Sequence, residues 1–327
     1  MSPAIGGEAA IVSAIAPNEQ HFRIPSHHPH LRLFLRYLAP SNPASRQEDV
    51  VLYVHGATFP SALSIAHRLD GKSWRDALCD AGFHVWGLDF HGFGYSDPYP
   101  AMAQAPERAP ALCRADDAAR QVATAVEFIA GRHAIEHLHI IAHSWGTMAT
   151  GLFATREPGL VNRLVFFAPI GQRHGPGPPP SLPAWRLISE QEQWDRFVED
   201  VPAGAAPVLS SIHFNDWSER YLATDAQSGT REPHSVKVPS GPLADIMAAW
   251  HGRLAYDPRE VQAPVEIIRG EWDNLVTDRD ARWLFDAFSR SPIRRDIKIG
   301  RATHLMHLEA NRHALHRESI TFLRGDH

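Results

Sequence analysis

Residues 138–147, LHIIAHSWGT, pass from a strand-like pattern to a helix-like pattern within a few positions. Leucine and isoleucine dominate the first four positions, as in a buried strand, and the residues after Trp145 have a composition typical of a helix. Ser144 stands at the corner between the two. A corner this sharp forces the serine into a rarely populated backbone conformation, and the residues around it must be small, as Ala142 and Gly146 are. The serine is therefore either the N-cap of the helix or an exposed nucleophile.

Beyond this corner, the chain alternates apolar strands with helical segments. The strands that we predict cover residues 50–56, 83–90, 138–144, 163–169, 264–273 and 294–300. The predicted helices cover residues 73–82, 115–132, 145–157, 278–290 and 305–323. Two earlier segments, 21–25 and 31–40, suit antiparallel strands at a sheet edge. This order predicts an α/β fold with a mostly parallel central sheet flanked by helices, in which the carboxyl ends of the parallel strands share one ligand-binding edge.

The alternation is interrupted after the strand at residues 163–169. Between residues 170 and 264 we find no convincing strand, and helical patterns cover about 184–200, 207–224 and 241–256. We predict a core of residues 1–170 and 257–327 and a helical cap, or lid, of residues 171–256 above the ligand-binding edge. Aromatic side chains either pack such a cap onto the core or face an apolar group of a substrate. Those that we expect at the substrate pocket are Phe59, Trp74, Trp185, Phe214 and Trp217.

An acid and a histidine follow the last two predicted strands. A serine hydroxyl becomes a good nucleophile only when a base removes its proton, and that base needs an acid to orient it. Asp273 ends one strand and His304 follows the next after a short loop, so both belong at the same edge as Ser144. The negative charge that develops during acyl transfer needs two backbone N–H donors, which we assign to Trp145 and to Ala57 in the loop after residues 50–56.

Other candidates near these positions have simpler explanations. His307 is a rival base, but it should lie within the last helix, whereas His304 lies on the loop before it. Asp278 and Asp280 are rival acids, but both fit the acidic first turn of the next helix. His143 directly precedes the nucleophile and points elsewhere, so we expect a structural role for it.

The motifs of the chain resemble those of the α/β-hydrolase family in its lid-bearing form. The resemblance extends from about residue 50 to residue 323 and rests on His55-Gly56, DFHGFGYSD at 89–97, the elbow at 142–146, Asp273, and His304 with Glu309 five residues later. The chain order serine, aspartate, histidine is also that of the family. One departure is alanine at position 142, where the family commonly has glycine. A second is the long loop of residues 57–74, which we expect at the mouth of the pocket.

The resemblance implies a serine hydrolase, and it gives a supporting role to the turn residues Asp89, Gly92 and Gly94. Carboxylic esters are the default substrates, because an alkoxide leaving group asks least of the acid catalyst. Lactone, thioester and carbon–carbon bond hydrolysis stay open as alternatives. A non-catalytic ligand-binding relative is the alternative from another class, but such proteins usually lack a catalytic residue and this sequence lacks none.

Aminopeptidase activity of the proline-iminopeptidase type is a further alternative. It would need acidic residues in the cap that hold the amine of the substrate. Acidic residues do occur there and also fit an ordinary solvated helix face; they are Glu190, Glu192, Asp195, Glu199 and Asp200.

The composition limits the partners of the chain. With 32 basic and 37 acidic side chains and no basic block, the chain has no feature that would track nucleic acid. Cys79 and Cys113 are too few for a disulfide framework, and no charged segment precedes the apolar stretch at residues 9–16, so we predict a cytoplasmic protein. No apolar run is long enough to cross a bilayer.

We expect neither a metal nor a cofactor. The glycines of HGFGYSD lack the spacing that would cradle a pyrophosphate. His27, His28 and His30 could in principle bind a metal, but a proline-containing turn between two strands also explains them, and no carboxylate or cysteine is close in sequence. The expected partner is a small-molecule ester.

Overall fold

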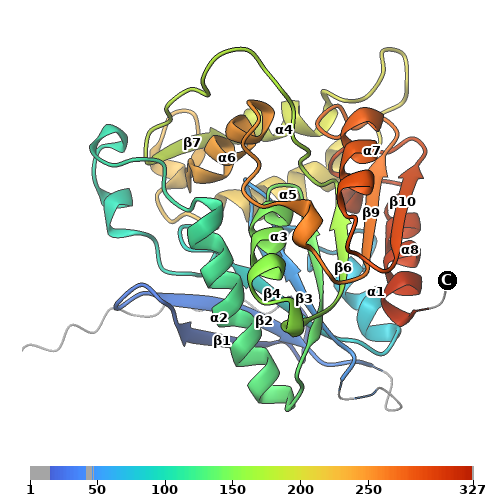
Figure 1. The fold of residues 1–327 in the computed structure, drawn as a ribbon. Coiled ribbons are helices and arrows are strands. Elements are labelled where there is room, and N and C mark those ends of the chain that lie inside the picture. The colour runs from blue at the N-terminus through green and yellow to red at the C-terminus, as the bar shows by residue number, and fades with distance from the viewer. Residues whose placement is uncertain (1–14, 42–45, 47, 326–327) are drawn as a thin grey trace, which may run out of the picture.

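An eight-stranded sheet forms the centre of the computed structural model, which describes residues 15–41, 46 and 48–325 (Figure 1). The strand order is β1-β2-β4-β3-β5-β6-β9-β10. The β1/β2 and β2/β4 pairs are antiparallel and the other neighbours are parallel, which confirms the predicted α/β class. The strands are β1 (Gln20–Pro25), β2 (Arg32–Leu38), β3 (Val50–Val54), β4 (His84–Asp89), β5 (Leu138–His143), β6 (Val161–Phe167), β9 (Val265–Gly270) and β10 (Arg294–Ile299).

Helices cover both faces of this sheet. Alternate strand residues enter two separate cores, so that Leu52 and Ile140 pack with α2 and α3 while Val51 and Ile141 pack with α1 and α8. Because the central strands are buried on both faces, they are apolar almost throughout. The helices outside the β6–β9 segment are α1 (Trp74–Asp80), α2 (Ala115–His133), α3 (Gly146–Arg156), α7 (Asp278–Ala287) and α8 (Arg312–Arg324).

The segment between β6 and β9, residues 168–264, is called the insertion below. In Figure 1 its helices and the β7–β8 pair lie above the carboxyl ends of the parallel strands, which is the edge that carries Ser144, and its last residues run down to the start of β9. Its elements are β7 (Trp185–Ser189), α4 (Glu190–Val198), α5 (Ser211–Leu222), β8 (Ser235–Pro239) and α6 (Gly241–Trp250).

The prediction that the insertion contains no strand was wrong. β7 and β8 form a separate antiparallel pair, and helix α4 begins at Glu190 rather than near residue 184. The reason lies in a capping box, in which Ser189 and Glu192 bond each other's backbone N–H groups and start the helix there. The strand before it depends on a partner almost fifty residues later, which no local pattern reveals.

The last helix also begins later than predicted. Met306–Leu308 is a single 3-10 turn, and α8 starts only at Arg312. His307 therefore lies in this short turn rather than within the helix.

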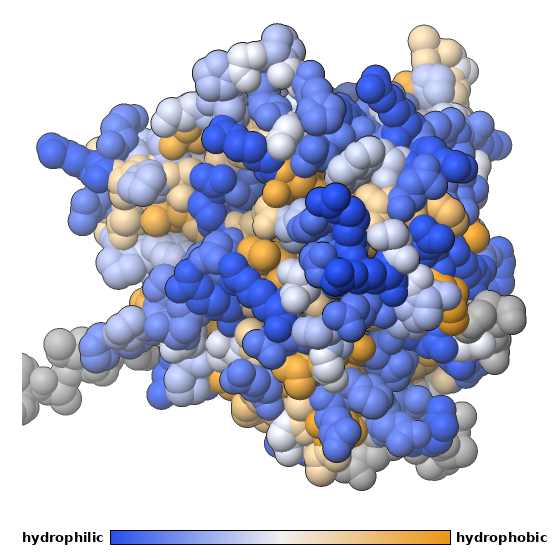
Figure 2. All heavy atoms as spheres, in the orientation of Figure 1, coloured by the Kyte–Doolittle hydropathy of each residue, from blue (hydrophilic) through white to orange (hydrophobic). Residues whose placement is uncertain are grey.

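Polar side chains cover most of the face in Figure 2, with apolar residues in small groups. This distribution fits a chain whose large apolar residues are mostly placed in the two cores. Among the described residues, no helix combines the length and the apolar character that a membrane span requires.

Candidate active site

Ser144 occupies a strained position on the turn between β5 and α3, with a φ angle of 54°. This left-handed conformation is costly for a residue other than glycine. Hydrogen bonds maintain it: the Ser144 N–H donates to the Phe167 carbonyl at 2.9 Å, and the Thr147 hydroxyl donates to the Ser144 carbonyl at 2.6 Å. Gly146 is required here, because a Cβ at this residue would lie 2.4 Å from the carbonyl oxygen of His55.

The fold brings Ser144, His304 and Asp273 into one chain of hydrogen bonds. His304 Nε2 lies 2.8 Å from Ser144 Oγ, and His304 Nδ1 lies 2.9 Å from Asp273 Oδ2. The second carboxylate oxygen of Asp273 accepts the N–H groups of Leu275 and Val276 at 2.9 and 3.0 Å, which fixes the orientation of the acid. All three side chains are buried, with Ser144 only 5% exposed. The geometry suits transfer of the hydroxyl proton to the imidazole.

The surroundings of Asp273 keep its carboxyl ionised. Burial raises the pKa of this group, but the charge and hydrogen bond of His304, together with the Val276 N–H, more than offset burial and hold the pKa below its usual range. The guanidinium of Arg196, from α4 in the insertion, adds to this lowering. An ionised acid at this place stabilises an imidazolium on His304.

The family follows from a comparison of the whole sequence. A family model described as "Serine aminopeptidase, S33" matches residues 47–311. The chain belongs to this family of α/β hydrolases. This membership agrees with the resemblance seen in the motifs, and no curated protein sequence gives a significant match.

Several solved structures share the fold of this α/β hydrolase. Carboxylesterase CesB from Bacillus subtilis matches with a TM-score of 0.60 and 16% identity over 95% of this chain and 94% of the other. The thioesterase domain from the curacin biosynthetic pathway gives 0.59 and 12% over 94% and 99%. The proline iminopeptidase of Mycobacterium smegmatis gives 0.56 and 17% over 94% and 98%. Identities this low show a common fold and not a common substrate.

The loop that carries His304 is held by Glu309, which accepts the N–H of Thr303 at 3.0 Å and also its hydroxyl. Burial raises the pKa of Glu309 to about 7, although these hydrogen bonds act in the opposite direction. In the sequence, Glu309 stood out only because it follows His304 by five residues. The structure shows that it holds the loop through its contacts with Thr303.

The two neighbouring histidines make other contacts. His143 Nε2 donates to the backbone carbonyl of His304 at 3.1 Å, and its ring stacks on Phe167. His307 packs against His143 with ring centroids 4.7 Å apart, and neither of its ring nitrogens has a hydrogen-bond partner among the described residues. Burial lowers the pKa of both side chains well below the ordinary value for histidine, so both are neutral near pH 7.

The rival acids lie in the first turn of α7, as predicted from the sequence. Asp278 forms ion pairs with Arg269 and Lys298. Asp280 completes a capping box with Thr277 and also binds Arg173. Neither carboxylate is hydrogen-bonded to His304.

The loop after β3 approaches the serine closely. A Cβ added at Gly56 would lie 3.3 Å from Ser144 Cβ, so the next residue, Ala57, follows a point of direct contact with the turn. His55 holds this loop, because its Nδ1 donates to the Gly56 carbonyl at 2.7 Å while its Nε2 accepts the N–H of Phe90 at 3.1 Å. The two expected N–H donors are therefore neighbours of this contact, since Ala57 follows Gly56 and Trp145 follows Ser144.

Sequence reasoning missed Asp245, which lies on α6 of the insertion. Its Oδ2 accepts the indole N–H of Trp145 at 3.0 Å and the N–H of Ala115, at the start of α2, at 2.6 Å. Arg114 pairs with the other oxygen. An aspartate among apolar helix residues was the available signal, since a buried carboxylate needs such partners. Asp245 therefore joins the insertion to the residue that follows Ser144.

The turn after β4 supports the same loop. Asp89 accepts the N–H of Ser61 at 2.9 Å and that of Tyr95 at 3.2 Å. A Cβ at Gly94 would lie 2.2 Å from the Asp89 carboxylate, which explains why glycine is present. These contacts agree with the supporting role that the resemblance implied.

Two of the five aromatic residues expected at the pocket lie elsewhere. Trp74 is the first residue of α1, and it packs in the core beneath α8, where its indole N–H donates to Ser319 Oγ at 3.1 Å. The capping box starts α1 at this residue, and Trp74 belongs with Leu78 and Cys79 to the buried face of the helix. Trp185 is partly exposed at the start of β7, donates to the Gln104 carbonyl at 3.0 Å and carries Lys237 over its ring.

The other three aromatic residues join the insertion to the loop after β3. Phe59 packs edge-on against Trp217, with centroids 5.1 Å apart, and its ring lies 6.1 Å from that of His307. The indole N–H of Trp217 donates to the Leu63 carbonyl at 2.9 Å. Phe214 stacks with Trp217 on α5. Phe59 is therefore the member of this group that lies nearest the histidines of the site.

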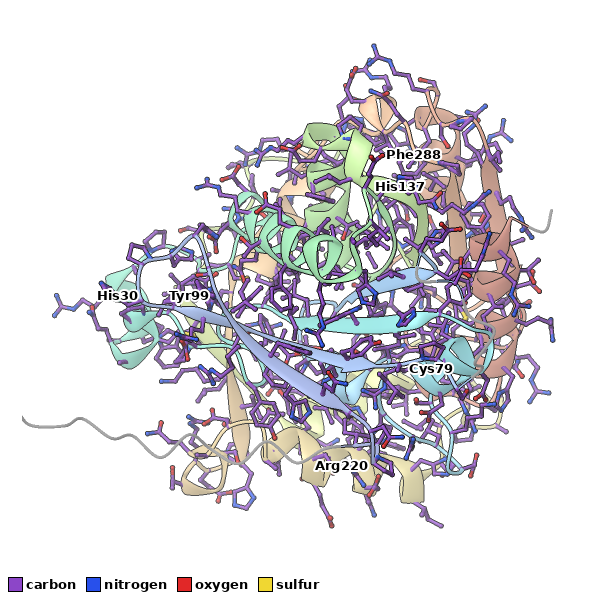
Figure 3. All side chains as sticks on the ribbon, turned by 90° about the horizontal axis from the view of Figure 1, so that it is seen from below. His30, Cys79, Tyr99, His137, Arg220 and Phe288 are labelled. Atoms are coloured by element: carbon purple, nitrogen blue, oxygen red, sulfur yellow. The ribbon has the colours of Figure 1, made fainter. Side chains whose placement is uncertain are left out.

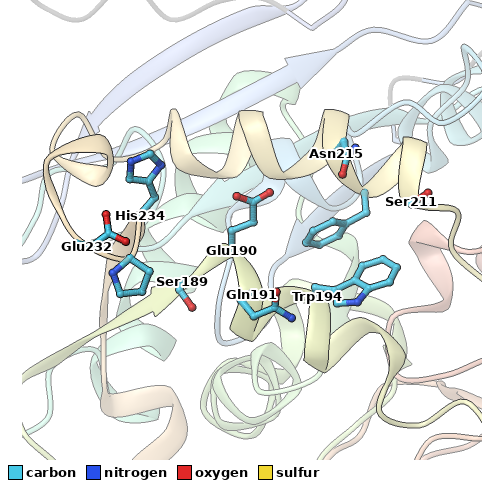
Figure 4. A pocket seen from close by; sticks show the side chains of 10 residues that line it. Ser189, Glu190, Gln191, Trp194, Ser211, Asn215, Glu232 and His234 are labelled. Carbon is cyan, nitrogen blue, oxygen red and sulfur yellow. The ribbon is translucent and has the colours of Figure 1, made fainter.

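Two cavities lie near these elements. A cleft of about 430 Å³, called the Thr58 cleft, runs between the loop after β3 and the insertion, and its walls include Thr58, Phe93, Met102 and Val238. A second cavity, of about 470 Å³, lies within the insertion between α4, α5 and the segment before β8 (Figure 4). Of the two, the Thr58 cleft reaches the residue next to Ala57. None of the five aromatic residues expected at the pocket lines this cleft, and Phe214 lines the second cavity.

Proposed function

We propose that this α/β hydrolase is a serine esterase that cleaves carboxylic esters of apolar or aromatic small molecules. The observation that carries the proposal is the hydrogen-bonded chain from Ser144 Oγ through His304 to Asp273. A helix cap needs no histidine and no acid at the ends of two later strands, whereas an activated serine needs both.

The proposed reaction has two halves. His304 takes the proton of Ser144 as the hydroxyl attacks the ester carbonyl, and the N–H groups of Ala57 and Trp145 bind the oxygen that becomes negative. His304 then gives that proton to the departing alkoxide, which leaves an acyl group on the serine. Water attacks this acyl-enzyme with His304 again as the base, and His304 then returns the proton to Ser144 Oγ as the carboxylic acid is released.

The insertion supports an ester rather than a peptide substrate. An aminopeptidase of this fold would need a free carboxylate there to hold a substrate amine, but the acidic candidates on α4 and just after it bind their own neighbours. Glu190 accepts from Ser218, and Glu192 completes the capping box with Ser189. The remaining three have partners on the same helix: Asp195 with Gln191, and Glu199 and Asp200 with Arg196.

We propose that the insertion acts as a cap and that the Thr58 cleft admits the substrate. Ser144 is almost fully buried beneath the insertion, so entry requires a path along its border with the core. The cleft follows that border, and the apolar part of its walls favours an apolar acyl or alcohol group. Its charged wall residues are Asp225, Arg231 and Lys237, of which Asp225 and Arg231 form an ion pair. Both cysteines are free and buried, which agrees with the cytoplasmic location that we propose.

The test is hydrolysis of p-nitrophenyl butyrate by the wild type, by Ser144→Ala and by Ser211→Ala, a matched change of an exposed serine on α5. We expect activity and labelling by a fluorophosphonate probe in the wild type and in Ser211→Ala, and loss of both in Ser144→Ala. Activity that survives in Ser144→Ala would exclude the serine mechanism. A parallel panel of lactones, thioesters and prolyl anilides shows which type of bond the protein cleaves. Preference for a prolyl anilide would favour the aminopeptidase alternative.

A further inference from the structure

The turn between β1 and β2 brings two histidines to a carboxylate from a distant part of the chain. His27 Nε2 lies 2.7 Å and His28 Nε2 lies 2.6 Å from the same oxygen, Asp117 Oδ1, in the first turn of α2. The three ligand atoms lie within 4.8 Å of one another. Figure 3 shows His30 of this turn and Tyr99 at the same end of the molecule.

The carboxylate is held from behind. Asp117 Oδ2 accepts the hydroxyl of Tyr99 and the side-chain amide of Gln121, the latter at 3.0 Å, so Oδ1 is the end left for the histidines. The ring of His28 packs edge-on against Tyr99 with centroids 5.4 Å apart. Outer hydrogen bonds of this kind orient metal ligands in known sites.

We propose that His27, His28 and Asp117 bind a divalent metal ion of the zinc type. Two imidazole nitrogens and one carboxylate oxygen are a common ligand set for zinc, and three protein ligands leave a fourth position for water. The side chains of His27 and His28 are 22% and 33% exposed, so an ion can enter from solvent. The site uses none of the residues of the proposed triad and stands independently of the esterase activity.

The competing explanation is a pair of hydrogen bonds without metal. Two imidazole N–H groups can donate to one carboxylate oxygen, and the distances of 2.7 and 2.6 Å fit such bonds as well. The metal is proposed because two imidazoles from one turn and a distant carboxylate, oriented by Tyr99 and Gln121, gather at a place open to solvent. The ligand atoms of a tetrahedral zinc ion lie about 3.3 Å apart, so both imidazoles would move outward from Asp117 Oδ1 as the ion replaces their hydrogen bonds and ties the β1–β2 turn to α2.

The experiment is calorimetric titration of the chelator-treated full-length protein with ZnCl₂. We expect one strong site in the wild type and loss of that site in His28→Gln. His30→Gln is the matched control, because His30 belongs to the same turn and is exposed but lies outside the cluster, and it should bind zinc like the wild type. Tyr99→Phe, which removes one outer hydrogen bond, should weaken binding about 10-fold.

A second readout tests the ligand set directly. Co²⁺ bound to the wild type should give visible absorption bands of a four-coordinate nitrogen and oxygen site, and these bands should be absent in His27→Gln. The proposal is overturned if the wild type shows no site stronger than His28→Gln, or if His30→Gln removes the site while His28→Gln retains it. Circular dichroism of each variant confirms that it is folded before the comparison is made.

Discussion

Replacement of Gly146 by alanine should lower the proposed esterase activity about 100-fold while the protein remains folded. A Cβ at this position would lie 2.4 Å from the carbonyl oxygen of His55 and 3.0 Å from that of Val54. Both atoms belong to the backbone at the end of β3, so no side-chain rotation can relieve the contact. Ordinary contact begins near 3.4 Å, which means that the turn and the loop must separate by about 1 Å.

This separation acts on the two segments that carry the proposed N–H donors. Ala57 follows the displaced end of β3, and Trp145 directly precedes the new side chain. A misplacement of about 1 Å can cost about 10²-fold in rate, and the loss of one such donor costs about 10² to 10³. Overpacking of a dense core costs about 1–3 kcal/mol, which leaves a folded protein with a lower melting temperature.

The assay measures kcat/KM for p-nitrophenyl butyrate together with thermal unfolding by circular dichroism. Gly131→Ala, in α2, is the matched control, because nothing lies within 4 Å of a Cβ there. That variant should keep full activity and gain up to about 1 kcal/mol of stability from the better helix former. If Gly146→Ala is as active as the control, the turn is not held against the loop in the way described and the reasoning fails.

Three further predictions concern stability and the attachment of the insertion. Burial raises the pKa of Glu266 to about 8, although the Arg295 guanidinium lies 3.4 Å away. An exposed glutamate titrates near 4.5. The stability that this group contributes is therefore complete below pH 4.5 and is lost as the pH rises through 8. Glu266→Gln should therefore raise the melting temperature at pH 9 and change it little at pH 4.5; an equal effect at both would contradict this. Asp245→Ala leaves the buried N–H groups of Trp145 and Ala115 without their acceptor. It should lower the free energy of unfolding in urea by about 3 kcal/mol and also lower kcat/KM. An unchanged urea midpoint would mean that these contacts contribute little to stability. Trp217→Phe keeps an aromatic ring but removes the hydrogen bond to the loop after β3, so limited proteolysis should cut the insertion faster than in the wild type, and equal rates would count against this anchor.

The sheet could be predicted because its strands identify themselves locally. Parallel strands that are buried on both faces consist of apolar residues almost throughout, and each is followed by a helical pattern, so composition and alternation suffice. β7 lacks both signals. Its residues are only partly buried, and its partner β8 follows α4 and α5 in the chain. Because α4 begins directly after β7, at Glu190, the local pattern resembles a helix.

That Ser144, Asp273 and His304 lie together could also be predicted, because topology alone brings the ends of β5, β9 and β10 to one edge. The contacts that hold these residues in place could not be predicted. Asp245 reaches Trp145 only through the way the insertion folds back over the core, and Trp74 turns away because it belongs to the buried face of its helix. The order of the elements predicts the backbone position of a residue, whereas packing decides the direction of its side chain.

The histidines of the β1–β2 turn illustrate the same limit for ligand sites. Distance along the sequence is a fair criterion when one loop supplies all the ligands, and by that criterion His27 and His28 have no carboxylate. The fold supplies one because β2 pairs with β4, and the chain leaving β4 runs on to the start of α2, where Asp117 lies. A carboxylate ninety residues from His27 is thus as close to the imidazole as one in the same turn could be. For a side chain beside a sheet edge, strand order rather than sequence separation decides which ligands are within reach.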